Sequence, residues 1–241
     1  MLLVDTGKVK LILILPSILY VLLLLLFPGI FNFYASFFRW PLGGEPVFVG
    51  VRNYADALYS DSRFHYSLQF TFLYAIAAVS IELIIGLLLA LILFFIPIGA
   101  KFNYAVRLLM IVPFMIAPLT AGYIWRMMFH GMYGVYTYFL TFFGYPKTDL
   151  YSDPNMALLG VILIDVWQWT PFAFLVFYAG LSTLPREPIE AAMVDGARGI
   201  ALIRYVVLPL LKPLIIVIAL LRIIDCLKVF DTIYISTGGG P

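Results

Sequence analysis

The segment from Pro185 to Pro213, PREPIEAAMVDGARGIALIRYVVLPLLKP, decides the fold. It is a rather polar, proline-bounded segment in a chain that is otherwise mostly apolar. A short helix is expected to start at Pro185, with the Ser182-Thr183 hydroxyls near its cap, and to run to about Asp195. Gly196 then permits a bend, and a second helical stretch follows with apolar residues at three-to-four spacing. The segment therefore predicts a helix–glycine–helix elbow with small side chains at its apex.

Composition identifies the surroundings of the rest of the chain. Of its 241 residues, 63% are hydrophobic and 12% charged, and the mean hydropathy is +1.03. No soluble domain needs that much apolar surface, so we expect a lipid bilayer as solvent. The one Gly-Lys pair, Gly7-Lys8, lacks the upstream glycine of a nucleotide-binding P-loop. A lone cysteine excludes an internal disulfide, and two distant histidines without companion cysteines argue against a metal site.

Long apolar stretches separated by polar, glycine-rich or proline-rich loops predict five transmembrane helices. The first is too long for a signal peptide and has no small-residue cleavage site. Pro113 and Pro118 are expected to kink the third helix. The expected spans are residues 11–38, 68–96, 108–129, 154–181 and 210–235.

Lysine and arginine are distributed unevenly among the loops. Eight lie in the N-terminal segment, the 97–107 loop and the elbow, whereas four lie in the loops on the other side. The positive-inside rule therefore places the N-terminus and the elbow in the cytoplasm. On this reading, residues 1–67 hold the first helix and an external loop, and residues 68–241 form a core with the elbow at 182–213.

The elbow, with the letters EAAMVDGA followed by Leu208-Pro209, resembles the EAA loop of permease subunits of binding-protein-dependent ABC importers. Val206 stands where that family usually has isoleucine. FVGVRNY at 48–54 and WQWTPF at 167–172 resemble the carbohydrate-uptake permeases of the family. In the family the EAA loop is the coupling helix that docks on the ATPase. The docking residues implied are Glu190, Ala191, Ala192, Asp195, Gly196, Ala197, Val206, Leu208 and Pro209.

The same resemblance implies the fold and the partners. The fold expected is an all-α integral membrane protein with the MetI-like transmembrane domain of a type I ABC importer, with about five helices present. In the family, the TGGGP turn at 237–241 leads into one more helix, so a final helix is expected to be missing. The implied partners are a second permease subunit, an ABC ATPase dimer and an extracytoplasmic sugar-binding protein that delivers carbohydrate, in a prokaryotic plasma membrane. ATP and Mg belong to the ATPase, and neither a cofactor on this chain nor a nucleic-acid partner is expected.

Ionisable residues inside the predicted helices need an explanation, because each costs about 2.5–3.5 kcal/mol on insertion scales. Arg222, Asp225 and Lys228 follow one another at intervals of three on one helix and can neutralise one another. Glu82 has no local cation, so we expect it to pair across helices with a lysine, an arginine or a hydroxyl. Arg126 is expected near the outer boundary, where its long side chain can reach the interface.

A hydrated substrate pathway is the functional alternative for several of these groups. Trp167 and Trp169 could stack on a sugar ring, although such aromatics also pack helices together or anchor them at the interface. The candidate pathway residues are Glu82, Asp165, Trp167, Trp169, Asp225 and Asp231.

The expected function is the transmembrane pore subunit of an ATP-driven sugar importer, without an ATPase site of its own. One alternative is an ion-coupled secondary transporter that uses Glu82 or Asp225. Such a carrier, however, needs no docking site for an ATPase. The other is a polytopic membrane enzyme with Asp165 in acid–base catalysis, but no HExxH, paired-carboxylate or nucleophile motif supports it.

Overall fold

The structure is a computed structural model that describes residues 6–96, 99–144 and 146–240. Expectations that rest on Pro97 or Pro241 lie outside the described residues. The chain divides into two compact units, Met1–Gln69 and Phe70–Pro241. Among the described residues, four helices are long and apolar enough to span a membrane, or five if one bent pair counts as a span.

The first unit begins with a long helix that contains a π-helical segment. Pro28 has no N–H, and its ring would crowd the carbonyl of Leu24, four residues earlier, in a regular α-helix. The wider π-turn lies over that carbonyl and lets the helix continue past the proline. No side chain of this long helix is buried over Ile12–Ala35, the part that is long and apolar enough to span a membrane. The three segments are α1 (Thr6–Val21), η1 (Leu22–Leu26) and α2 (Phe27–Ala35).

A small hairpin and a short helix follow, and they give the FVGVRNY stretch a local role. The Asn53 side chain donates hydrogen bonds to the carbonyls of Ser36 (2.9 Å) and Phe38 (3.0 Å). The Phe38 and Phe48 rings pack edge to face, with centroids 5.3 Å apart. The stretch therefore closes the hairpin onto the helix. The elements are β1 (Phe38–Arg39), antiparallel to β2 (Val47–Phe48), and α3 (Arg52–Tyr59).

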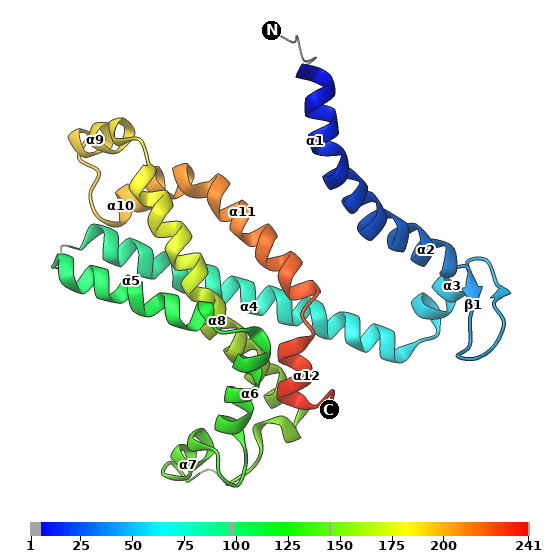
Figure 1. Ribbon diagram of the computed structural model, residues 1–241. Coiled ribbons are helices and arrows are strands. Elements are labelled where there is room, and N and C mark those ends of the chain that lie inside the picture. Colours follow the sequence, from blue (N-terminus) through cyan, green and yellow to red (C-terminus); the bar gives the residue numbers. More distant parts are fainter. Residues whose placement is uncertain (1–5, 97–98, 145, 241) are drawn as a thin grey trace. The chain divides into compact units, whose positions relative to one another are not determined.

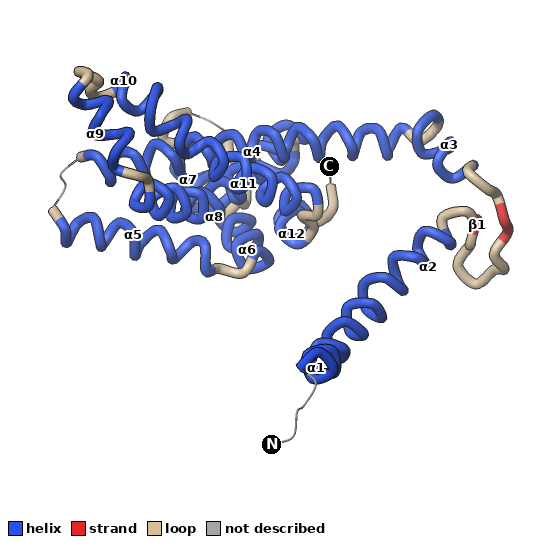
Figure 2. Tube along the Cα trace, turned by 90° about the horizontal axis from the view of Figure 1, so that it is seen from above, coloured by secondary structure: helices blue, strands red, loops and turns tan. Residues whose placement is uncertain are grey.

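The second unit is a helical bundle around α8 (Pro154–Thr183), which crosses α4 (Ser62–Phe95) and α5 (Ala100–Met115) and packs against α11 (Leu208–Leu227) (Figures 1 and 2). Its core joins Ala90 of α4 to Phe174 and Phe177 of α8. Gly86 permits this close approach, because a Cβ there would lie 2.9 Å from the backbone nitrogen of Phe174. The helix α4 (Ser62–Phe95) continues across the boundary between the units.

The third predicted span is two helices, α5 (Ala100–Met115) and α6 (Pro118–Phe129), bent by 94°. The expectation of one kinked helix over 108–129 is therefore wrong. The residue before a proline avoids the α region, and Ala117 accordingly adopts ψ of 139°. The Gln168 side chain of α8 donates a 2.6 Å hydrogen bond to the carbonyl of Ile116, which the break has freed.

The last predicted span, 210–235, is also wrong in its bounds. A continuous helical span runs from Ile200 to Leu227 through a π-helical segment, and Pro209 and Pro213 lie inside it. As at Pro28, the π-turn precedes the proline and accommodates its ring. Residues 228–230 then separate it from a short last helix, whose Thr232 lies against Gly122 of α6. The segments are α10 (Ile200–Leu202), η3 (Ile203–Val207), α11 (Leu208–Leu227) and α12 (Asp231–Thr237).

The connection between α6 and α8 carries two short helices. They are α7 (Val135–Thr141) and η2 (Leu150–Ser152). The Asp153 carboxylate caps α8 by accepting from the backbone N–H groups of Asn155 and Met156, both at 3.0 Å. This cap fixes the start of the central helix.

Candidate functional site

The predicted elbow is present at one end of the second unit, remote from α6 and α12 (Figure 1). Its first helix, α9 (Arg186–Val194), starts and ends within one residue of the expected Pro185 and Asp195, and Gly196 follows at φ of +90°. Gly199 has φ of +54°, a second left-handed position just before α10. Only glycine adopts such angles without strain, so the two glycines bend the chain from α9 into the long span.

The expected hydroxyl cap of α9 is absent. Ser182 and Thr183 still belong to α8, and their hydroxyls donate to the carbonyls of Tyr178 (2.9 Å) and Gly180 (3.0 Å). The helix α9 instead starts after Pro185, which makes no side-chain cap.

The nine implied docking residues fall into two groups. The side chains of the first group face outward and are available to a partner. Those of the second group are half-buried, and three of them pack against the core of the bundle. The exposed residues are Glu190, Ala191, Asp195, Gly196 and Pro209, and the half-buried ones are Ala192, Ala197, Val206 and Leu208. The elbow is thus fastened on its inner side and open on its outer side.

A groove of about 540 Å³ lies beside α9. Its walls come from the end of α4, the end of α8 and α9 itself, and include Leu181, Ile189 and Met193. Met193 and Val194 are exposed, with 54% and 87% of their surfaces accessible. Together with the groove, these two side chains offer apolar contact area to another protein.

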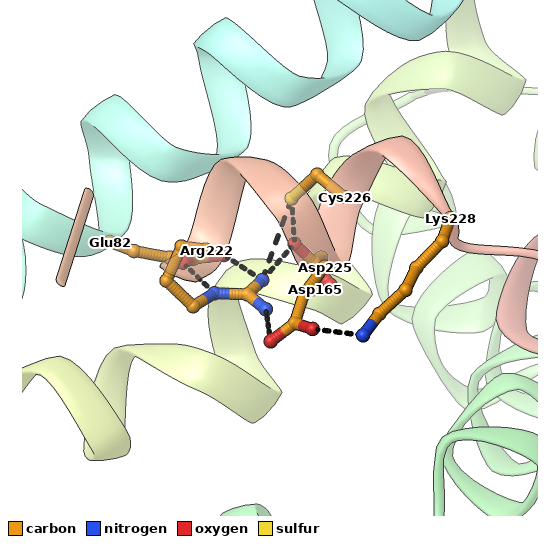
Figure 3. Close-up of polar contacts among 6 residues, drawn as sticks. All are labelled: Glu82, Asp165, Arg222, Asp225, Cys226 and Lys228. Carbon is orange, nitrogen blue, oxygen red and sulfur yellow. Dashed lines mark hydrogen bonds and ion pairs between the residues drawn. The ribbon is translucent and has the colours of Figure 1, made fainter. Parts of the chain in front are cut away.

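Arg222 is the centre of a second site, in the interior of the bundle (Figure 3). Its guanidinium donates to both carboxylate oxygens of Glu82, from Nε at 2.7 Å and from Nη2 at 3.1 Å. Nη2 also donates to Asp165 Oδ2 at 2.8 Å. Arg222 and Glu82 are fully buried, with 1% and 0% exposure. The arginine of α11 therefore joins α4 to α8.

The remaining charges extend this cluster toward the pocket described below. Asp225 lies 3.7 Å from Arg222 Nη1, and Lys228 Nζ lies 2.8 Å from Asp225 Oδ1 (Figure 3). Two predictions are confirmed: the 222–225–228 ion pairs form, although Lys228 lies just past the end of α11, and Glu82 pairs with a basic residue of another helix. Arg126 is exposed, and its Nη1 donates to the Ile235 carbonyl at 2.9 Å.

The two tryptophans have different neighbours. The Arg222 guanidinium lies over the Trp169 ring, 4.3 Å from its centroid, a cation–π contact. Trp169 also contacts Phe114 of α5 edge to face. Trp167 packs against Trp125 of α6, with centroids 5.6 Å apart. Trp169 therefore belongs to the charge cluster, whereas Trp167 joins two helices.

A pocket of about 220 Å³, which we call the charged pocket, opens beside this cluster. It contains four of the six predicted pathway residues: Asp165, Trp169, Asp225 and Asp231. Glu82 and Trp167 are not in its wall, although Glu82 binds Arg222, which is. The full lining is Pro118, Asp165, Trp169, Arg222, Asp225, Lys228, Val229, Phe230, Asp231 and Thr232.

The sequence placed Arg222 and Lys228 among the ionisable residues inside the predicted helices but not among the pathway residues. Their position in the helix was the available signal, because a cation within a span needs partners. Pro118 and Thr232 carried no such signal. They reach the wall of the charged pocket because the helix breaks before α6 and because α12 starts where it does, and neither feature could be read from the sequence. Among the described residues, no group of three histidine, cysteine or acidic side chains is placed to hold a metal ion.

Comparison with known proteins identifies the family of this chain. A family model described as "Binding-protein-dependent transport system inner membrane component" matches residues 82–241. The trehalose/maltose transport system permease protein MalF of Thermococcus litoralis is 36% identical over 98% of this chain and 79% of its own length. The sn-glycerol-3-phosphate transport system permease protein UgpA of Agrobacterium fabrum is 32% identical over 95% and 78%.

The fold also matches a solved structure. A chain from the crystal structure of a bacterial ABC transporter involved in the import of the acidic polysaccharide alginate superposes with a TM-score of 0.79. The match covers 95% of this chain and 80% of that one, at 20% sequence identity. The two chains therefore share a fold.

Proposed function

Because this chain belongs to the family of binding-protein-dependent transport system inner membrane components, we propose that it forms the transmembrane pore of an ATP-driven importer and carries a sugar across the membrane. It is a transport subunit and not an enzyme, since members of this family leave ATP hydrolysis to a separate chain. A sugar is the substrate class favoured by relatives named for trehalose and maltose.

The elbow is the observation that carries this proposal. Its outer surface presents Glu190 and Ala191 on α9 and Asp195 just after it. Small side chains let the surface of a partner approach the backbone, and the adjoining groove adds apolar area. On its inner side, Ala192 and Val206 pack against the core, so the elbow moves with the bundle. A docking helix for an ATPase needs both properties.

Coupling follows from the connections of the elbow. It is joined to α8 before Pro185 and to the span that begins at Ile200. We propose that closure of two partner ATPases pushes the elbow, and that α8 and α11 transmit this displacement to the charged pocket. ATP and Mg would be held by the ATPase dimer, and no cofactor is assigned to this chain.

The remaining parts of the assembly are a second permease subunit and an extracytoplasmic sugar-binding protein. The latter is supported by the solved alginate transporter, which was crystallised with a periplasmic protein bound to alginate pentasaccharide. We place the N-terminus and the elbow in the cytoplasm of a prokaryotic plasma membrane, because the positively charged loops are on that side.

The charged pocket is our candidate for part of the substrate pathway. Asp165, Asp225 and Asp231 offer carboxylate acceptors to sugar hydroxyls, and Trp169 offers an aromatic wall. Glu82 would not contact the substrate itself but would hold Arg222 in place. Trp167, which packs against Trp125, has a structural role.

An exposed alanine gives the sharpest test of docking. Ala191→Arg adds a long charged side chain to the outer surface of α9 without filling the core, whereas Ala192→Arg would also disturb packing. We expect the Ala191→Arg variant to lose co-purification of the ATPase and ATP-driven sugar uptake. The matched control is Ala55→Arg, on the exposed face of α3, which should retain both.

Normal uptake by the Ala191→Arg variant would contradict the docking assignment. Uptake that persists without ATP but disappears when an ion gradient is collapsed would favour a secondary transporter instead. The readouts are mass spectrometry of co-purified subunits and uptake of radiolabelled sugar into proteoliposomes.

A further inference from the structure

We propose that the charged pocket selects uncharged saccharides and rejects anionic ones, an inference that rests on the proposed function and narrows its substrate class. The relatives leave this point open, because those named above include a trehalose/maltose permease and a glycerol-phosphate permease. The charges that line the pocket distinguish between these two substrate classes.

Arg222 is a cation in the pocket wall that would attract an anionic substrate. Its Nε and Nη2 already donate to Glu82, and Nη2 also donates to Asp165. One face of the guanidinium is covered by the Trp169 ring, 4.3 Å away. Arginine has five N–H donors in one plane, and most of them are engaged or covered here. Nη1 faces the Asp225 carboxylate at 3.7 Å, so an anion that approached this cation would meet the negative charge of that carboxylate or of the two that already bind the guanidinium.

Lys228, although more exposed than Arg222, is also paired with a carboxylate. Its ammonium lies 2.8 Å from Asp225 Oδ1, and the other oxygen of that carboxylate lies 3.7 Å from Arg222 Nη1. Lys228 is the more exposed partner, with 70% of its side chain accessible against 35% for Asp225. A phosphate or carboxylate that approached Lys228 would therefore meet the charge of Asp225 at short range.

The carboxylates in and around the pocket outnumber the cations. Four carboxylates, those of Glu82, Asp165, Asp225 and Asp231, accompany two cations in the cluster and the pocket wall. One protonated carboxyl among the four would still leave the group without a net positive charge. Within residues 6–96, 99–144 and 146–240, no ion pair neutralises the exposed Asp231 carboxylate. The pocket therefore repels anions, and the repulsion is strong where water is partly excluded.

Uncharged sugars fit the same features. Sugar hydroxyls donate hydrogen bonds, and ionised carboxylates only accept them, so Asp225 and Asp231 complement hydroxyl groups. The volume of about 220 Å³ is small beside the roughly 300–1,000 Å³ of sites for drug-sized ligands. A single sugar ring with its hydroxyls matches that size better than a long chain does.

Two methyl glycosides that differ in one group test the selection. Methyl β-glucoside and methyl β-glucuronoside share a ring, and the second has a carboxylate in place of the C6 hydroxymethyl group. We would measure their equilibrium binding, by saturation-transfer NMR, to the permease complex in lipid nanodiscs without its binding protein. The binding protein, which has its own selectivity, is thereby removed from the comparison.

The uncharged glycoside should bind, and the anionic one should bind about tenfold more weakly or worse, because like charges repel strongly at protein dielectric constants. Asp231→Asn removes an unpaired charge from the wall, so it should reduce this discrimination several-fold. Asp153→Asn is the matched control, because Asn caps α8 as well as Asp does and lies outside the pocket. It should leave the discrimination unchanged.

Equal binding of the two glycosides, tighter binding of the anionic one, binding of neither, or an unchanged ratio in the Asp231→Asn variant would each overturn the inference. ATP-driven uptake of sugar into proteoliposomes by the complete importer, measured in parallel, separates this failure from failure of the proposed function. Uptake with no charge discrimination refutes only the pocket selectivity, whereas no uptake of any saccharide refutes the importer as well.

Discussion

Replacement of Arg222 by leucine should be among the most damaging single changes in the bundle. The substitution keeps an apolar stem but removes the cation that Glu82 and Asp165 share. Glu82 is 0% exposed and Asp165 is 5% exposed, so neither carboxylate gains much water in exchange. The variant would hold two uncompensated carboxylates between α4, α8 and α11.

The magnitude follows from the contacts that are lost. Three charge-assisted hydrogen bonds disappear, at 2.7, 2.8 and 3.1 Å. Removing one partner of a buried ion pair typically costs about 3–5 kcal/mol, most of it the cost of leaving charge unpaired. For a chain of this length, about 1 kcal/mol corresponds to a shift in Tm of roughly 2–4 °C. We therefore expect the Tm to fall by roughly 6–20 °C.

Thermal unfolding of the assembled complex in detergent, followed by tryptophan fluorescence, measures this shift. The control is Arg126→Leu, because Arg126 is exposed and makes one hydrogen bond to the Ile235 carbonyl. Its Tm should stay within roughly 2 °C of that of the unmodified complex. A triple variant, Arg222→Leu with Glu82→Gln and Asp165→Asn, removes the unpaired charges and should recover part of the loss.

An Arg222→Leu complex with an unchanged Tm would refute the reasoning, since it would mean that the cluster contributes no net stability. A triple variant less stable than Arg222→Leu would also contradict it. In that case the loss would come from packing around the arginine stem and not from unpaired carboxylates.

Three further substitutions test other parts of the bundle by the same thermal measurement. Gly86→Val should lower the free energy of unfolding by about 1–3 kcal/mol, because the added side chain overpacks α4 against α8. Gly29→Val is the control, since no atom lies within 4 Å of the added Cβ. Equal losses of stability in the two variants would contradict the close approach at Gly86. Gly196→Ala should lower the free energy of unfolding by about 1 kcal/mol, because φ is +90° at this position. It should also lower ATP-driven uptake, and full uptake would show that the elbow tolerates another conformation. Gln168→Leu should cost about 1–3 kcal/mol by orphaning the Ile116 carbonyl, and an unchanged Tm would mean that water replaces the amide.

The elbow could be predicted because its signals are local. Glycine at a bend and a proline at the start of a helix act within a few residues, and α9 and Gly196 lie where the letters indicated. The pairing of Glu82 was predictable for a different reason. A carboxylate without a local cation in a membrane span needs a partner from elsewhere, and Arg222, 140 residues away, supplies it.

The prolines show what sequence reasoning could not decide. Pro209 and Pro118 look alike in the sequence, yet a π-turn accommodates the first and the chain turns by 94° before the second. The outcome at Pro118 depends on Gln168, which binds the freed carbonyl of Ile116 from another helix. Local propensity does not contain that contact. The wall of the charged pocket was unpredictable for the same reason, because α6, α8, α11 and α12 all contribute to it.

The unbroken span from Ile200 to Leu227 connects the elbow directly to the charge cluster, so a tilt of this helix at the elbow displaces Arg222 at its far end. At 1.5 Å per residue, Arg222 stands about 33 Å along the axis from Ile200. A tilt of only about 5° pivoting at the elbow would carry the guanidinium about 3 Å sideways over that arm. That travel equals the length of the bonds that hold it to Glu82 and Asp165. Small angular displacements at the elbow would thus suffice to exchange every partner of Arg222, or to move α4 and α8 along with it.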